Sequence, residues 1–180
     1  MKKWIAAALT AIILFLTPLP AEAQDFSNDV TVKSGYTAEE LAEGLKGNLR
    51  ELATEFVAAE EKYGVNAVFL AAVAAWESGW GRYCFRENNF FGWGKKAFSS
   101  PEEGIDFVAS KIADYYLSPD GKYYHGVSVE GVNHSYNGTK LWVDKVTGFM
   151  AIISQKAEES RQERSFIPPV HSETGKIILG

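Results

Sequence analysis

The chain has 180 residues, of which 46% are hydrophobic, 23% charged and 13% aromatic, proportions that exclude a disordered or a fibrous protein. The formal net charge of −5 argues against a nucleic-acid-binding protein, which would be basic. With Cys84 as its single cysteine, the chain can form no intrachain disulfide, and we expect this side chain to be buried as a small apolar group.

The first 23 residues have the features of an export signal. Lys2 and Lys3 precede an apolar run over residues 4–16, and the A-x-A pattern at 21–23 predicts cleavage after Ala23. Removing this segment leaves 157 residues with a net charge of −6, because the signal carries two lysines and one glutamate. No later stretch approaches the length of about 18 apolar residues that a membrane span needs. We therefore expect a secreted protein without a membrane span.

Helices account for most of the predicted structure in the first half of the mature chain. A capping box of Thr37 and Glu40 predicts a short first helix after an N-terminal extension over 24–36. Apolar residues near a 3.6 period predict a second helix over 48–63, which Gly64 ends. Residues 67–76 are apolar on every face, and this predicts a central helix enclosed by the others.

The second half begins with a loop or small hairpin over 78–98, rich in glycine, asparagine and aromatic residues. Ser100 followed by Pro101 and Glu103 predicts a helix start, and the turn residues at 118–121 predict its end. A further loop-rich stretch precedes a last helix, which we expect to fray beyond Gln155. One domain over 37–164 and a C-terminal tail over 165–180 complete the predicted organisation.

Glu77 is the first ionisable side chain after the apolar central helix. Burial and the negative end of the helix dipole both disfavour its carboxylate, so both raise its pKa. A carboxylic acid that stays protonated near neutral pH is what general-acid catalysis requires. The alternative is a glutamate at a helix end that faces water or pairs with Arg82.

Aromatic side chains and amides are crowded together around Glu77. Apolar sugar faces pack on aromatic planes, while hydroxyl and acetamido groups need amide partners, so this mixture suits a saccharide cleft. The alternative is that the individual rings belong to the core. We assign the tyrosines at 115, 116, 123 and 124 mainly to packing, with the far side of the cleft as the alternative. The aromatic and amide residues are Trp76, Trp80, Phe85, Asn88, Asn89, Phe90, Phe91 and Trp93.

Three sequence blocks, in this order, resemble the glucosaminidase domain of bacterial autolysins, which are peptidoglycan hydrolases of the lysozyme-like superfamily. The blocks are LAAVAAWESGWG at 70–81, NNFFG at 88–92 and SPEEGID at 100–106. Tyr136 and Trp142 also fall where the family pattern has aromatic residues. The resemblance covers residues 49–153, and it departs from the common form in the tryptophan before Glu77 and in the short interval between the first two blocks.

The resemblance implies an α+β fold that is predominantly α-helical and lysozyme-like, with a central buried helix and a small loop or hairpin lobe. It also implies an endo-β-N-acetylglucosaminidase that cleaves peptidoglycan after N-acetylglucosamine. Glu77 matches the catalytic acid, and Tyr136 matches a tyrosine that shapes the site near the acetamido group. The residues then expected to bind substrate are Trp80, Asn89, Phe91, Trp93 and Trp142.

The expected partner is the peptidoglycan glycan strand, bound by a monomer outside the cell or in the cell wall, with no nucleic acid involved. We expect no cofactor and no metal, because His125 and His134 lack the spacing of metal ligands.

Glycoside hydrolysis ordinarily uses a second carboxylate, and the sequence leaves this group open. The candidates are Glu87, Asp120, Glu130 and Asp144, with Glu130 first because residues 127–131 are predicted to form a short strand facing the cleft. Assistance by the N-acetyl group of the substrate would need none of them. Two other functions also remain: a lytic transglycosylase or muramidase on the same scaffold, and a non-catalytic wall-binding module.

Overall fold

The computed structural model describes residues 24–166, and over this range the chain folds into helices joined by loops, without a strand. The predominantly helical fold is therefore confirmed, and of the loop or small hairpin expected over 78–98 it is the loop that forms. The predicted export signal lies outside the described residues, as does nearly all of the tail. The elements are α1 (Ala38–Gly44), the 3₁₀ helix η1 (Gly47–Leu52), α2 (Ala53–Tyr63), α3 (Ala67–Ser78), α4 (Pro101–Ile112), the π-helix η2 (Ala113–Leu117), α5 (Val129–Tyr136) and α6 (Lys140–Ser165).

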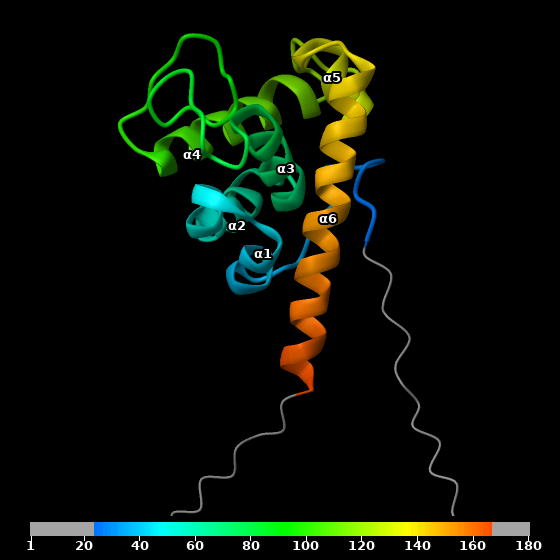
Figure 1. The fold of residues 1–180 in the computed structure, drawn as a ribbon. Helices are drawn as coiled ribbons and strands as arrows, with labels where there is room; N and C mark the ends of the chain where they lie inside the picture. Colours follow the sequence, from blue (N-terminus) through cyan, green and yellow to red (C-terminus); the bar gives the residue numbers. More distant parts are fainter. Residues whose placement is uncertain (1–23, 167–180) are drawn as a thin grey trace, which may run out of the picture.

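Helix α3 is the predicted central helix, and it packs against α2 and α6 (Figure 1). Asn66 begins it, because its side-chain oxygen accepts a hydrogen bond from the backbone N–H of Phe69. Every side chain from Ala67 through Ala75 is buried. Gly79 ends the helix in the left-handed conformation, with φ of +57°. Glu77 is thereby fixed in the last turn, where the helix leaves the core.

The helix starts predicted at Thr37 and at Ser100 are confirmed. The side chain of Thr37 accepts from the backbone N–H of Glu40, whose carboxylate accepts from the N–H of Thr37, so the capping box forms. Ser100 caps α4, and Pro101 is its first residue. The predicted helix over 48–63 is present as two consecutive elements, η1 and α2.

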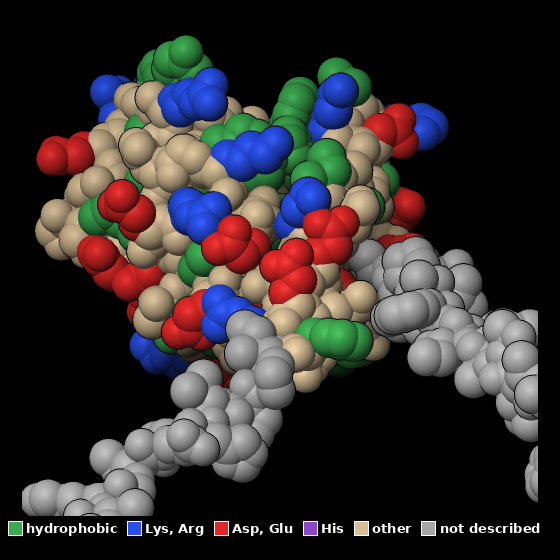
Figure 2. Space-filling model, turned by 60° about the horizontal axis from the view of Figure 1, so that its bottom comes forward, with side chains coloured by type: hydrophobic (Ala, Val, Ile, Leu, Met, Phe, Trp, Pro, Cys, Tyr) green, Lys and Arg blue, Asp and Glu red, His purple; other side chains and the backbone are tan. Residues whose placement is uncertain are grey.

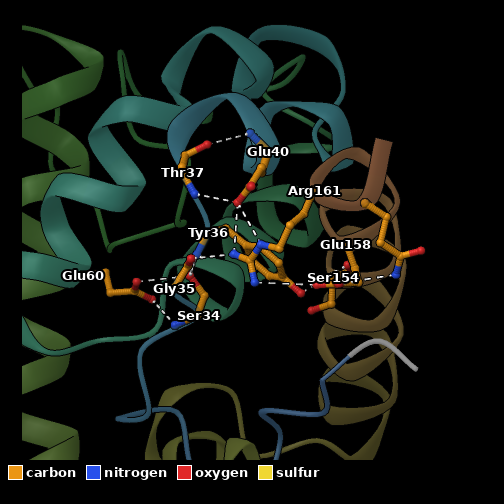
Figure 3. Close-up of polar contacts among 10 residues, drawn as sticks. Ser34, Gly35, Tyr36, Thr37, Glu40, Glu60, Ser154, Glu158 and Arg161 are labelled. Carbon is orange, nitrogen blue, oxygen red and sulfur yellow. Dashed lines mark hydrogen bonds and ion pairs between the residues drawn. The ribbon is translucent and has the colours of Figure 1, made fainter. Parts of the chain in front are cut away.

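Helix α6 runs the length of the domain beside α3 and α1 (Figure 1). The expected fraying beyond Gln155 is wrong, because the helix continues to Ser165. Arg161 anchors this last part to the N-terminal segment (Figure 3). It donates to the Glu40 carboxylate at 3.2 and 3.0 Å and to the Gly35 carbonyl at 2.5 Å, and its guanidinium lies 4.5 Å from the centre of the Tyr36 ring. These contacts stabilise a charged helix end that has little apolar sequence of its own.

Residues 127–131 do not form the strand that we predicted around Glu130. They lead into α5, because the side chain of Ser128 accepts a hydrogen bond from the N–H of Gly131 and so acts as a helix N-cap. Glu130 lies exposed in the first turn of α5. Tyr136 is the last residue of the same helix.

Acidic and basic side chains are interspersed on the face shown in Figure 2. None of the helices within residues 24–166 combines the length and the apolar character needed to cross a bilayer. Cys84, which we expected to be buried, is exposed, because the loop over 82–87 lies on the surface throughout.

Candidate active site

Glu77 projects from the last turn of α3 and is half-buried. Its Oε1 atom accepts a hydrogen bond of 2.8 Å from the indole Nε1–H of Trp142 on α6. Its Oε2 atom faces Gly92, where a Cβ atom would lie 3.3 Å from this oxygen. No residue within 24–166 donates a hydrogen bond to Oε2. One carboxyl oxygen is thus held in place, and the other is available to a substrate.

Burial raises the pKa of Glu77, and the smaller opposing effect of the Trp142 N–H, which favours the carboxylate, does not cancel it. The direction predicted from the sequence is therefore confirmed. Within the described residues no neighbouring carboxylate contributes to this shift, and Glu77 makes no ion pair with Arg82. The site holds a carboxylic acid that keeps its proton to a higher pH than an ordinary glutamate.

A pocket of about 190 Å³ lies beside Glu77, and Gly92, which faces Oε2 of Glu77, is one of its wall residues. The complete wall is formed by Gly92, Trp93, Gly94, Tyr116 and Tyr136. The Tyr136 ring centre lies 6.1 Å from that of Trp93 and 5.9 Å from that of Tyr116. Tyr116, which we assigned mainly to packing, is a buried residue that also contributes to this wall.

Tyr136 connects the pocket to Glu77 and to the loop that follows α3. Its hydroxyl donates a hydrogen bond of 2.8 Å to the Phe91 carbonyl, and its ring centre lies 5.3 Å from that of Trp142. Burial raises the pKa of the Tyr136 hydroxyl well above its usual range, and the charges of Glu77 and Tyr116 add to the effect. Tyr136 therefore stays neutral over the pH range in which a glutamate titrates.

Asn89 and Phe91, which we predicted to bind sugar, instead support the loop that carries the pocket. Asn89 is 3% exposed; its amide donates to the carbonyls of Trp93 (3.2 Å) and Lys96 (2.8 Å), and its oxygen accepts from the Trp93 N–H (2.9 Å). Because both amide N–H groups are bonded to carbonyls and the side chain is almost fully buried, Asn89 is not presented to a substrate. Phe91 is 1% exposed and belongs to the core. Both residues position Gly92 and Trp93.

Trp142 and Trp80 also have surroundings that the sequence did not predict. Trp142 is 1% exposed, so its ring has no free face for a sugar, and its N–H bonds the Glu77 carboxyl. Trp80 is half-buried, and its ring packs edge-on against Phe149 on α6, with 5.0 Å between ring centres. Trp93, which we predicted to bind substrate, lies in the wall of the pocket at Tyr136.

None of the candidate second carboxylates contributes to the pKa shift of Glu77. Glu87, Asp120, Glu130 and Asp144 are all exposed, and Asp144 pairs with Lys140 at 2.7 Å. Across residues 24–166, no group of three or more histidine, cysteine, aspartate or glutamate side chains is placed to hold a metal ion. The residues that the fold does bring together are Glu77, Gly92, Trp93, Tyr116, Tyr136 and Trp142.

This helical fold, with a desolvated glutamate at the end of its central helix, defines a lysozyme-like domain. The family model described as mannosyl-glycoprotein endo-beta-N-acetylglucosaminidase matches residues 53–157. The chain therefore belongs to the glucosaminidase family, and the resemblance found in the sequence is confirmed.

Known relatives agree with this assignment. Proteins from two strains of Streptococcus pneumoniae, both provisionally named endo-beta-N-acetylglucosaminidase, are 31% identical over 145 residues. The match covers 71% of this chain and 22% and 20% of the relatives, so the chain spans about a fifth of their length. Whatever else these relatives contain lies outside the comparison.

The fold is also that of solved autolysin structures. S. aureus autolysin E in complex with the muropeptide NAM-L-Ala-D-iGlu is 23% identical, with a TM-score of 0.61, and the match covers 78% of this chain and 75% of that one. A catalytic glutamate-to-alanine mutant of autolysin E in complex with the disaccharide NAG-NAM is 22% identical, with a TM-score of 0.61 and coverage of 77% and 74%. At this identity the likeness shows the shared lysozyme-like fold.

Proposed function

We propose that the chain is a peptidoglycan hydrolase that cleaves the β-1,4 bond after N-acetylglucosamine, with Glu77 as the general acid. The observation that carries the proposal is the Glu77 carboxyl, half-buried beside an aromatic pocket, with one oxygen held by Trp142 and the other free. Membership of the glucosaminidase family supports the reaction type. The muropeptide and disaccharide bound by autolysin E support peptidoglycan as the substrate.

In this mechanism the proton on Oε2 of Glu77 passes to the glycosidic oxygen as the bond breaks. Gly92 leaves room for that oxygen, because it has no side chain opposite Oε2. The carboxylate that forms is stabilised by the Trp142 N–H at Oε1, since a hydrogen bond to a charged acceptor is stronger than one to a neutral acceptor. The donor is already in place before reaction, so its orientation costs nothing in the transition state.

The acetamido group of the substrate is proposed to act as the nucleophile in the first step: its carbonyl oxygen bonds to the anomeric carbon as the bond to the protonated glycosidic oxygen breaks. Water then attacks the same carbon, losing a proton to the Glu77 carboxylate, and releases the acetamido oxygen. The hydrogen of the Tyr136 hydroxyl is engaged by the Phe91 carbonyl, so the phenolic oxygen presents only acceptor lone pairs to the pocket. An acetamide N–H bound there would turn its carbonyl oxygen toward the anomeric carbon. This arrangement needs no second carboxylate, and it fits a Glu77 whose pKa no neighbouring carboxylate affects among the described residues. Trp93, at the wall of the same pocket, is proposed to pack on the sugar.

The products of digested cell walls test the proposed cleavage. Mass spectrometry of fragments released by the mature protein should show reducing N-acetylglucosamine ends. Anhydro-muramic ends would establish a lytic transglycosylase instead, and reducing muramic ends a muramidase. Calorimetric binding of glycan oligomers without any released fragment would establish a wall-binding module.

We further propose that the protein is exported and acts in the wall or outside the cell after loss of residues 1–23. The N-terminal sequence of the mature protein should then begin at Gln24. An uncleaved N-terminus in an exporting host would contradict this part of the proposal.

A further inference from the structure

A second hollow lies along α6 and shares no wall residue with the pocket at Tyr136. Its volume is about 230 Å³, and it is lined by Asp144, Lys145, Gly148, Phe149 and Ile152. Phe149 follows Trp142 by seven residues, which is two helical turns, so both lie on one face of the helix about 10 Å apart along its axis. We call this hollow, together with the adjoining Trp80 and Lys46, the α6 furrow.

Gly148 keeps the α6 furrow open. A helix is less stable with glycine in its interior than with alanine. A glycine inside a helix as long as α6 therefore calls for an explanation. A Cβ atom at Gly148 would meet nothing within 4 Å, so close packing inside the protein is not the reason. By contrast, a Cβ at Gly44 would lie 2.6 Å from the Ile153 carbonyl oxygen, which explains that glycine completely. The space at Gly148 is available to a ligand.

Trp80 adjoins the hollow through its contact with Phe149, and its backbone is strained. Its φ of +66° is in the left-handed region, which bulky residues seldom adopt, and it continues a left-handed run from Gly79 to Gly81. Such strain tends to be retained where it positions a functional side chain. Here it places the indole edge-on against Phe149, with the Nζ atom of Lys46 5.5 Å from the ring centre.

The charges at the furrow are unlike those of the chain as a whole, which is acidic. Lys46 and Lys145 are exposed, and neither lies within 4.0 Å of a carboxylate among residues 24–166. Asp144, also in the wall, is paired with Lys140 at 2.7 Å. The furrow therefore combines two aromatic rings with two ammonium groups that have no partner within the described part of the chain.

We propose that the α6 furrow binds the carboxylate-bearing peptide stem that is attached to the glycan strand beside the cleaved bond. The stem's carboxylates pair with Lys46 and Lys145, and its apolar part packs on Trp80 and Phe149 over the open backbone at Gly148. The proposal rests on the proposed function, because it places the glycan at Glu77 and the stem two turns further along α6. Charge complementarity and the place of Phe149, two turns along α6 from the Trp142 that bonds Glu77, select this occupant.

The test compares cleavage of peptide-bearing peptidoglycan with cleavage of the same glycan stripped of peptides by an amidase. The double variant K46Q/K145Q should lose about tenfold in kcat/KM on the peptide-bearing substrate, as expected for two partly exposed ion pairs. On the stripped glycan it should stay close to wild type. The matched control is K33Q/K156Q, which removes the same charge from exposed lysines outside the furrow.

A second pair of variants tests the space itself. G148L should fill the furrow and lower cleavage of the peptide-bearing substrate only, and G148A, which adds a single methyl group, should lower it in the same direction by a smaller factor. Equal losses on both substrates, or no loss on either, would overturn the proposal while the proposed function stands. If the wild-type protein cleaves neither substrate, the proposed function fails. In that case, calorimetry with NAM-L-Ala-D-iGlu tests binding at the furrow separately from cleavage. Equal affinities of the wild type and K46Q/K145Q for this compound would overturn the proposed stem site.

Discussion

Replacing Trp142 by phenylalanine removes the one hydrogen-bond donor that the described residues offer to the Glu77 carboxyl. The N–H favours the carboxylate, so it lowers the pKa of Glu77 and partly opposes the rise caused by burial. Without it the pKa rises further. Glu77 acts in its protonated form, so the alkaline limb of the pH–activity profile moves to higher pH.

The size of this shift follows from the exposure of Glu77. A hydrogen bond to a charged group contributes about 1.5–3 kcal/mol when it is buried. Because Glu77 is only half-buried, water replaces part of the lost bond, and we discount the value to about 1.4 kcal/mol. The maximal rate should also fall, by about tenfold, because the carboxylate formed in the reaction loses the same stabilisation. The smaller ring leaves a cavity that lowers the free energy of unfolding by about 2 kcal/mol.

The assay is kcat/KM as a function of pH on a soluble glycan substrate, together with thermal unfolding followed by circular dichroism. The matched control is Val146→Ala, which creates a cavity at a fully buried position one turn further along α6 without touching the carboxyl. It should be destabilised similarly while its alkaline limb stays in place. An alkaline limb that is unmoved in Trp142→Phe, or that moves to lower pH, would refute this account of the acid.

Three further changes test the supporting structure. Asn89→Ala removes the three hydrogen bonds that the Asn89 amide makes within the loop, so the free energy of unfolding should fall by about 2–3 kcal/mol. The kcat should fall as well, while KM changes little. An unchanged melting temperature would contradict this expectation. Gly148→Ala should raise the free energy of unfolding by about 0.5–1 kcal/mol in urea titrations, because alanine favours a helix and its Cβ would meet no neighbour. A lower free energy of unfolding than that of the wild type would contradict this. Burial raises the pKa of Glu40, but hydrogen bonds from Arg161 and Thr37 outweigh it and lower the pKa below its ordinary value. Arg161→Gln should therefore cost about 1–2 kcal/mol at pH 7, with the difference from wild type shrinking below about pH 4 as Glu40 is protonated; an equal difference at pH 3 and pH 7 would exclude this ion pair.

Local signals in the sequence were sufficient for the helix starts and for the central helix. The capping box at Thr37 and the Ser100-Pro101 start each depend on side chains within four residues of the backbone they bond. The all-apolar run of α3 likewise needs only its own composition to require burial. Glu77 could be singled out for the same reason, because it is the ionisable group at the end of that run.

The errors concern contacts between residues that are distant in the chain. The end of α6 looked too polar to persist, but Arg161 bonds Glu40 across 121 residues. Trp142 looked like a sugar platform, yet its N–H meets Glu77 across 65 residues and its ring is buried. Periodicity in one segment carries no information about such pairs.

At Glu130 and Asn89 the local sequence was compatible with two structures, and it could not select between them. Valine-rich residues 127–129 favour a strand, but Ser128 offers an N-cap, and the cap prevailed once α5 could bury Val129 and Val132. The amide of Asn89 suits a sugar and a loop carbonyl equally well. Only the fold shows that the loop uses it.

The central claim is that Glu77 supplies the proton, and Glu77→Gln tests it most directly. Glutamine keeps the shape of the side chain and an oxygen that accepts from Trp142, but it carries no acidic proton. Reducing ends released from purified peptidoglycan should fall about 10²–10⁴-fold, with an unchanged circular dichroism spectrum and melting temperature. Glu87→Gln, at an exposed position in the following loop, should retain full activity. Release by Glu77→Gln at the rate of the wild-type protein would contradict the account.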